Sequence, residues 1–526
     1  MQLFFTFLAY TLFVAGYSWY KLRKEKLNSH EGYFLGGRSL TGIVIAGSML
    51  LTNISTEHLI GMNGSSYKNG FIIIAWEVTS ALALILTAVY FVPKYLKMGL
   101  TTIPQFLENR FDGFTRSLVA FFLMISFILT LLPIVLYTGA INLESIFNVS
   151  ELLGVSQTQG MNYTICAIGL VGSLYAIFGG LKAVAVSDTL NGYGLLVGGL
   201  VIPFIALLSI GEGSPMQGLS SVYRNAPEKF NVIGAKDSVM PFEVLFTGLI
   251  INQIYFWCMN QMIIQRALGA KNLKEAQKGL LFTGLLKILV PLIIILPGVI
   301  GFYYFGDLYY DRQDMIYPEL IKKALPAGFV GVFAAIVMGA VLSTFNSVLN
   351  SAATIFSIDI FKRHINPEIS DRRLVKIGKM TSAVLAIFAI VVAPMVAHAP
   401  DGLYQLLQQL NGIFFIPIAS IMLAGFFLPK VSALAAKVAL LVGLVFYISC
   451  TFIFKVDLHF VHIWGIEFII NMAVMGLISC FIPKENAFQI TDLQIVEMKE
   501  WEFTKGFSIF LVVSTLLIYI LMGSFN

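Results

Sequence analysis

Long apolar runs recur along the whole chain and leave few folds open to it. A transmembrane helix needs about 20 mostly apolar residues, and here 57% of the residues are hydrophobic, 12% are charged and mean hydropathy is +0.83. Windows of that length give about fourteen candidate spans, near residues 3–20, 43–62, 71–93, 117–145, 161–178, 184–210, 241–262, 279–304, 327–360, 375–397, 403–428, 431–453, 459–482 and 506–523. We therefore predict an all-α integral membrane protein without a soluble domain.

Positive charge predicts the orientation of these spans, because short cytoplasmic loops carry an excess of Lys and Arg. The first run lacks a small-residue cleavage site and is followed by Lys21, so we interpret it as a retained helix and not as a signal peptide. Basic loops then alternate along the chain. With an even number of spans, both termini are expected on the extracellular or periplasmic side of the cell (inner or plasma) membrane. The net charge of +5 follows from these loops, and we expect no nucleic-acid partner.

A single lysine, Lys287, interrupts the apolar run at residues 279–304. Insertion scales put the cost of a charge at the centre of a membrane helix at about 2.5–3.5 kcal/mol, so such a residue usually marks an ion or substrate pathway. Glu77, in the apolar run at residues 71–92, is its candidate partner. The alternatives are a purely structural ion pair and a lysine that snorkels to the interface.

The second candidate span contains a polar block, residues 48–58, followed by Gly61 and Gly64. Backbone groups freed by an unwound turn inside a membrane must line a cavity or bind something. We therefore predict a broken helix, the device with which many secondary transporters coordinate sodium and substrate near the midplane. The alternative is a polar surface between packed helices.

A second polar stripe follows the span that begins near residue 327. Its members recur at three- and four-residue spacing and so share one helical face: Ser343, Thr344, Ser347, Asn350, Ser351 and Thr354. Hydroxyl oxygens suit a hard monovalent cation, and carbonyls from a break near Leu51 to Ile54 would complete its shell. A Ca²⁺ or Mg²⁺ site would require clustered carboxylates. A Ser/Thr stripe can also serve only as contact between helices.

Several short motifs together resemble the sodium/solute symporter family, and within it the sodium/galactose and sodium/glucose cotransporters. They are the Tyr33–Arg38 block, Asn53-Ile54-Ser55 with Glu57-His58, the Tyr175–Ala183 block, Trp257 with Asn260-Gln261, Gln265-Arg266, and Val341-Leu342-Ser343-Thr344. The resemblance implies a leucine-transporter-like fold with a 5+5 inverted repeat. Its parts would be an N-terminal extra helix and cytoplasmic loop (1–40), a first repeat (41–211), an extracellular loop (212–240), a second repeat (241–430) and three C-terminal helices (431–526).

The resemblance also implies two sites. Sodium would be held by the carbonyls of Leu51, Ile54 and Ala340 and by the hydroxyls of Ser343 and Thr344. The substrate would be held by His58, Glu77, Ser80, Gln253, Trp257, Lys287 and Gln408. Phe256 stands where the family has the tyrosine of an inner gate over the sugar, and Asn53 and Asp188 are assigned to the ion pathway or to coupling. This mixture of donors and acceptors suits the hydroxyls of a pyranose, each of which needs a partner once desolvated.

We therefore predict a secondary active transporter that couples inward Na⁺ movement to uptake of a sugar, a hexose such as galactose or glucose, by alternating access. The alternative substrates are inositol, sialic acid and an amino acid, and a passive channel is the alternative from another class. An enzyme is not expected, because the membrane region shows no assembled nucleophile and base. Na⁺ is the expected coupling ion, with no organic cofactor. The lipid bilayer is the expected surrounding, and a monomer is expected to suffice.

Overall fold

The computed structural model describes residues 2–22, 29–55, 57–398, 403–484 and 488–524. Every regular element in this part of the chain is a helix, and the strand-like pairing there is limited to one isolated bridge between Leu40 and Ala270. Eleven of these helices are long and apolar enough to cross a membrane: Glu57–Lys97, Gly113–Phe147, Gln157–Ile177, Gly180–Ile210, Leu273–Phe305, Gly328–Ile365, Asp371–Val396, Tyr404–Phe427, Ala433–Ile453, Phe460–Phe481 and Thr504–Met522. The predicted all-α membrane fold is confirmed.

Three predicted spans are not in this set, and one of them is continuous while the other two are divided. The first, near 3–20, forms α1 (Gln2–Leu22), a helix of 21 residues. The second and seventh, near 43–62 and 241–262, are each divided by a break. The second divides into α3 (Gly42–Asn53) and the π-helical η2 (Glu57–Met62), and the seventh into α14 (Gly248–Cys258) and α15 (Gln261–Leu268). The count of fourteen crossings therefore stays a prediction.

Both divided helices begin a predicted repeat, and the structure ties them together. Leu40, just before α3, donates its amide to the carbonyl of Gly269 (3.1 Å) and accepts from Lys271 (3.0 Å), just after α15. In the first break, Ile54 and Ser55 leave the helix, and Thr56 lies outside the described residues. In the second, Asn260 caps α15 by accepting from the amide of Met262 (2.9 Å).

The first repeat continues through a long, locally distorted helix and a short capped helix. The elements in chain order are α4 (Asn63–Asn69), η3 (Gly70–Ile74), α5 (Ala75–Val78), α6 (Ser80–Leu86), η4 (Thr87–Phe91), α7 (Val92–Lys97), α8 (Ile103–Arg110), α9 (Gly113–Ser126), η5 (Phe127–Leu131), α10 (Leu132–Phe147), α11 (Val149–Leu153) and α12 (Gln157–Ile210). Helix α8 begins with a capping box formed by Thr102 and Gln105 and has Pro104 in its first turn. Gly180 adopts φ +59° inside α12 and divides it into two spans.

The second half contains the helices that carry the polar stripe and Lys287. They are α13 (Pro215–Asn225), η6 (Pro227–Phe230), η7 (Phe242–Phe246), α16 (Leu273–Phe305), η8 (Tyr310–Met315), α17 (Ile316–Ala324), α18 (Ala327–Ile355), η9 (Phe356–Ile365), α19 (Asp371–Val392), η10 (Ala393–His398) and α20 (Leu403–Phe427). Residues 273–279 form the first turns of α16. Asn272 caps this helix, which runs on without interruption through Gly279 into the span.

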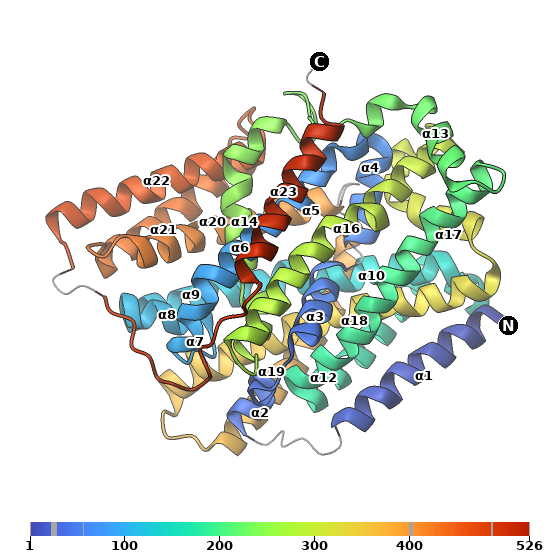
Figure 1. The fold of residues 1–526 in the computed structure, drawn as a ribbon. Helices are drawn as coiled ribbons and strands as arrows, with labels where there is room; N and C mark the ends of the chain where they lie inside the picture. The colour runs from blue at the N-terminus through green and yellow to red at the C-terminus, as the bar shows by residue number, and fades with distance from the viewer. Residues whose placement is uncertain (1, 23–28, 56, 399–402, 485–487, 525–526) are drawn as a thin grey trace.

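The core helices α3, α12, α16 and α18 pack against one another, and α1 lies along one edge of the molecule against α12 and α18 (Figure 1). The C-terminal helices are α21 (Ala433–Ile448), extended by η11 (Ser449–Ile453), then α22 (Phe460–Phe481) and α23 (Thr504–Met522). Helices α20, α21 and α22 pack together at one side, while α23 crosses the front beside α16 and α6 (Figure 1). Short helices α2 (His30–Phe34) and η1 (Gly36–Arg38) precede α3, and Gly36 and Gly37 take positive φ angles there, as predicted for a tight bend.

Candidate functional site

The break after α3 frees two of the carbonyls assigned to sodium. In a continuous helix, the amides of Ser55 and His58 would donate to the carbonyls of Leu51 and Ile54. Here Ser55 donates to Asn53 (3.2 Å) and His58 donates to Ser55 (3.1 Å). The carbonyls of Leu51 and Ile54 therefore lose their helical donors in a buried part of the protein, and such groups need another partner.

The polar stripe of α18 lies directly against this break. The Thr344 hydroxyl donates to the carbonyl of Thr52 (3.1 Å), and the hydroxyl of Ser347 lies 3.2 Å from that of Thr52. The Ser343 hydroxyl is buried and makes no hydrogen bond of normal geometry with the described residues. Ala340 lies one turn earlier on the same helix and is fully buried. The structure thus brings the predicted sodium ligands of α3 and α18 to one place.

Lys287 and Glu77 are in direct contact. The Lys287 ammonium donates to the Glu77 carboxylate and to the Asn53 side-chain oxygen (2.6 Å). Both charged side chains are 1% exposed, so neither charge is solvated by bulk water. Breaking such a buried pair by removing one partner typically costs 3–5 kcal/mol. Asn53 lies between Leu51 and Ile54 in the chain, so this one residue links the helix break to the ion pair.

One cavity is lined by every residue assigned to the substrate. It contains His58, Glu77, Ser80, Gln253, Phe256, Trp257, Lys287 and Gln408, together with Asn53 and Thr344. Its volume is about 50 Å³, whereas small-molecule sites usually measure roughly 300–1,000 Å³. The groups are assembled in this conformation, but the space between them is too small for a sugar.

Gln253 holds one wall of this cavity together. Its side-chain oxygen accepts from Ser80 (3.0 Å) and from the indole of Trp257 (3.1 Å), and its amide nitrogen donates to the carbonyl of Trp76 (2.8 Å) and to the hydroxyl of Thr79 (3.1 Å). These bonds join α14 to α5 and α6. Gln253 is therefore already saturated, and it fixes the positions of Ser80 and Trp257.

Aromatic side chains cover the cavity. The ring of Tyr404 packs edge-on against His58 (centroids 5.3 Å apart) and against Trp76 (5.9 Å), and its hydroxyl accepts from Gln408 (2.8 Å). His58 also lies 3.9 Å from Glu77 and 3.8 Å from Glu57. This cover explains how the pocket is kept closed in the structure.

Sequence reasoning missed several lining residues, among them Glu57, Asn252, Tyr404 and Asn411. Helical spacing could have found three of them. Tyr404 and Asn411 lie four residues before and three after Gln408, and residues so spaced share a helical face. Asn252 lies four residues before Phe256 on α14 and shares its face in the same way.

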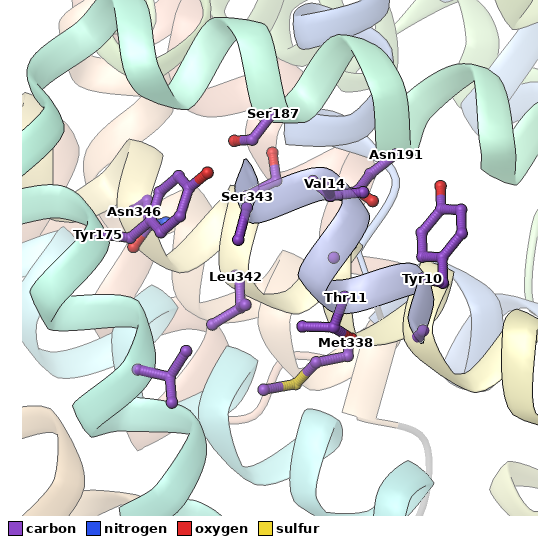
Figure 2. A pocket seen from close by; sticks show the side chains of 14 residues that line it. Tyr10, Thr11, Val14, Tyr175, Ser187, Asn191, Met338, Leu342, Ser343 and Asn346 are labelled. Carbon is purple, nitrogen blue, oxygen red and sulfur yellow. The ribbon is translucent and has the colours of Figure 1, made fainter. Parts of the chain in front are cut away.

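A second cavity reaches the other side of the predicted sodium ligands. It measures about 160 Å³ and lies between α1, α12 and α18. Figure 2 shows Ser343 and Asn346 on its α18 wall, facing Ser187 and Asn191 of α12, with Tyr10, Thr11 and Val14 of α1 closing it. The consecutive residues Ser343 and Thr344 thus line different cavities, and the ligand set lies between the two.

Asp188 is engaged by side chains. Its carboxylate accepts from the hydroxyl of Ser48 (2.8 Å) and from the guanidinium of Arg266 (3.4 Å), and Arg266 also donates to Ser347. All of these residues are buried. In this conformation Asp188 is part of a structural network under the polar stripe, and a role in the ion pathway stays a prediction.

Comparison with known families decides the class of the protein. The profile of the Sodium:solute symporter family matches residues 33–443. The chain belongs to this family. It is therefore a Na⁺-coupled solute symporter of the membrane, and it is not an enzyme.

Relatives within the family carry different names. The chain is 44% identical to the uncharacterized symporter YidK of Escherichia coli (strain K12) over 521 residues, 99% of this chain and 91% of that protein. It is 33% identical to the sodium/glucose cotransporter of Vibrio parahaemolyticus over 451 residues, 82% of this chain and 81% of that protein. It is 30% identical to the sodium/myo-inositol cotransporter of Bos taurus over 461 residues, 80% of this chain and 62% of that protein.

A solved structure supports the fold. A Na⁺-coupled sialic acid symporter in a substrate-bound outward-open state aligns with a TM-score of 0.78 at 20% identity, covering 92% of this chain and 99% of that one. The likeness shows the leucine-transporter-like fold. At this identity it carries no information about the substrate of the present protein.

Proposed function

We propose that this protein moves one neutral, hydroxyl-rich solute, a hexose such as glucose or galactose, into the cell together with Na⁺ by alternating access. The observation that carries the proposal is the cavity that gathers His58, Glu77, Ser80, Gln253, Phe256, Trp257, Lys287 and Gln408. These side chains supply charged, amide and imidazole partners for hydroxyl groups. The rings of Phe256 and Trp257 supply an apolar surface for the face of a pyranose.

The charge of the cavity favours a neutral substrate. Among the described lining residues, Lys287 is the sole lysine or arginine, and Glu77 already pairs with it. Glu57 adds a second carboxyl group to the lining. A net-anionic substrate such as sialic acid would meet two acidic groups and one engaged cation, so like-charge contact would oppose its binding.

Inositol is the second candidate. Its ring of hydroxyls presents the same chemistry to these residues, and a relative at 30% identity is named as a sodium/myo-inositol cotransporter. A polyol lacks the ring oxygen and the anomeric centre of a hexose. Selectivity between the two would therefore depend on which hydroxyls find partners, because an unpaired buried polar group costs about 1–3 kcal/mol.

We place sodium between α3 and α18, on the carbonyls of Leu51, Ile54 and Ala340 and the hydroxyls of Ser343 and Thr344. The support is the loss of helical donors at Leu51 and Ile54, the unpaired Ser343 hydroxyl and the contact between Thr344 and Thr52. A cation there would join the two helices and set the position of Asn53, which contacts Lys287. Sodium would in this way organise the substrate cavity, as coupling requires differential affinity for the two conformations.

The driving force is sufficient for accumulation. One charge moving through about 100 mV releases about 2.3 kcal/mol, and a tenfold sodium gradient adds about 1.4 kcal/mol. One Na⁺ per cycle would therefore sustain accumulation on the order of several hundred-fold. The cavity of about 50 Å³ must open before a sugar enters, and separation of Tyr404 from His58 is the simplest route.

Uptake into proteoliposomes tests the proposal. Purified protein would face an inward Na⁺ gradient, with K⁺ as the control, and labelled glucose, galactose, inositol, proline and sialic acid would be offered separately. We expect Na⁺-dependent accumulation of a hexose. Accumulation of proline or sialic acid alone would overturn the substrate class and leave the sodium symport itself intact.

A further inference from the structure

A buried acid far along the chain from the substrate residues has no role in the account so far. Glu467 lies in the middle of α22, which packs on α14, α20 and α21 (Figure 1). Its side chain is 0% exposed, and both carboxyl oxygens lack a hydrogen-bond partner among the described residues. None of the ion pairs between those residues includes it, in contrast to Glu77 and Asp188.

Other polar groups gather around Glu467. Asn471, one turn further along α22, donates to the hydroxyl of Ser420 on α20 (3.3 Å), but its side-chain oxygen is buried and unpaired. The indole nitrogen of Trp464, one turn before, is also unpaired. Gly443 of α21 packs against this cluster. A Cβ atom there would lie 2.5 Å from the side-chain amide nitrogen of Asn471, so a larger residue would displace Asn471.

The facing helices bring no free cation to Glu467. Lys437 of α21 is the one lysine or arginine on α14, α20 and α21, and it pairs with Asp112 (2.8 Å). The titratable groups with an electrostatic interaction at Glu467 are Tyr447 of α21 and Cys450 of η11. The Tyr447 hydroxyl donates to the carbonyl of Gln409 on α20 (2.9 Å). Helix α20 contributes only uncharged groups here: Ser420, which contacts Asn471, and the backbone carbonyl of Gln409, which contacts Tyr447. Helix α14 approaches α22 through Gly248, which lies against Trp464 and Gly465. An ionised carboxylate would thus be buried with no counter-ion, which membranes tolerate only at high cost.

We propose that Glu467 is a proton-binding site. The carboxylate takes up one H⁺ from water to form the neutral acid, and it keeps this proton while α20, α21 and α22 are packed as observed. The acid then offers an O–H donor to the unpaired acceptor of Asn471. Release of the proton requires that water reach the cluster, so proton binding and the packing of these helices are linked.

This site lies behind the wall of the substrate cavity. The ring of Trp464 contacts the ring of Trp76 (6.3 Å between centroids), and Trp76 lines that cavity. The Tyr447 hydroxyl binds the backbone of Gln409, next to Gln408. If the protein transports sugar as proposed, loss of the proton from Glu467 disturbs both contacts and lowers uptake at alkaline pH.

Infrared spectroscopy of the purified protein tests the proton itself and needs no substrate. We expect the spectrum at neutral pH to contain a protonated carboxyl C=O stretch that Glu467→Gln removes. The matched control Glu319→Gln removes a partly exposed acid paired with Lys322 (3.1 Å), and it should remove only ionised carboxylate signal. Loss of ionised carboxylate signal in Glu467→Gln would overturn the proposal.

A second measurement uses the unchanged protein and covers the case in which the variant does not fold. Dicyclohexylcarbodiimide reacts with protonated carboxyl groups in apolar surroundings, and mass spectrometry locates the adduct. We expect labelling of the peptide that contains Glu467, decreasing as pH rises, and no labelling of Glu319. Absence of the adduct at Glu467, with labelling of other buried acids, would contradict the proposal.

Uptake then tests the link to transport separately. Wild-type uptake should decline over the alkaline range in which the infrared band disappears, and Glu467→Gln should keep its uptake there. An equal alkaline decline in both proteins would refute the link. If no sugar is transported at all, the spectroscopic result still decides whether Glu467 binds a proton.

Discussion

Removal of the Ser343 hydroxyl should weaken sodium activation without weakening the fold. This hydroxyl makes no hydrogen bond of normal geometry with the described residues, so Ser343→Ala removes only its interaction with the Asp188 carboxylate, which Ser48 and Arg266 also contact. A polar contact to a charged group contributes about 1.5–3 kcal/mol. Loss of one sodium ligand of that strength raises the Na⁺ concentration for half-maximal uptake by roughly 10- to 150-fold.

The assay is uptake of the transported sugar at a series of Na⁺ concentrations, with thermal unfolding measured in sodium-free buffer. The matched control is Ser351→Ala, two turns further along the same stripe, where the hydroxyl donates to Gln265 (3.0 Å). The control should lose about 0.5–1.5 kcal/mol of stability and keep its sodium dependence. An unchanged sodium dependence of Ser343→Ala, or an equal change in the control, would refute the site assignment.

Three further substitutions test other parts of the account. Lys287→Met leaves Glu77 buried without its cation, so uptake should be lost and stability should fall by about 3–5 kcal/mol; full uptake in this variant would make the pair dispensable. Phe256→Ala should raise the KM for sugar by roughly 2- to 13-fold through loss of a ring contact worth about 0.5–1.5 kcal/mol, and a KM equal to wild type would remove Phe256 from the site. Lys229 donates to the carbonyls of Tyr67 and Lys68 (3.1 and 3.0 Å), so Lys229→Met should lower stability by about 1–3 kcal/mol. The control Lys236→Met changes an exposed lysine, and its melting temperature should equal that of wild type.

The parts of the site that the sequence predicted share a physical reason. Polar residues inside apolar runs are costly to insert into a membrane, so each one indicates a function by itself. This reasoning predicted Lys287, Glu77 and the block around Asn53. The break at Ile54 was predicted for the same reason, and the structure confirms it. Motif resemblance then supplied further lining residues, including Gln253 and Gln408, but not Tyr404, Asn252 or Asn411.

Other features depend on tertiary contacts that one sequence does not carry. Arg266 as the partner of Asp188 joins α15 to α12, and nothing in the spacing of the two residues indicates the contact. The cover formed by Tyr404 on His58 joins α20 to η2, and the closed volume of the cavity follows from that packing. The number of crossings was predicted from hydropathy alone, which does not separate continuous spans from the divided helices that start each predicted repeat.

The most direct test of sodium-coupled sugar transport is the current produced when sugar is added to reconstituted protein on a solid-supported membrane. One Na⁺ moving with a neutral sugar carries one positive charge per cycle. We predict an inward positive current on addition of glucose or galactose in Na⁺, absent in K⁺ and reduced in Ser343→Ala at low Na⁺. A folded wild-type protein that gives no Na⁺-dependent current with any hexose or inositol would contradict the account.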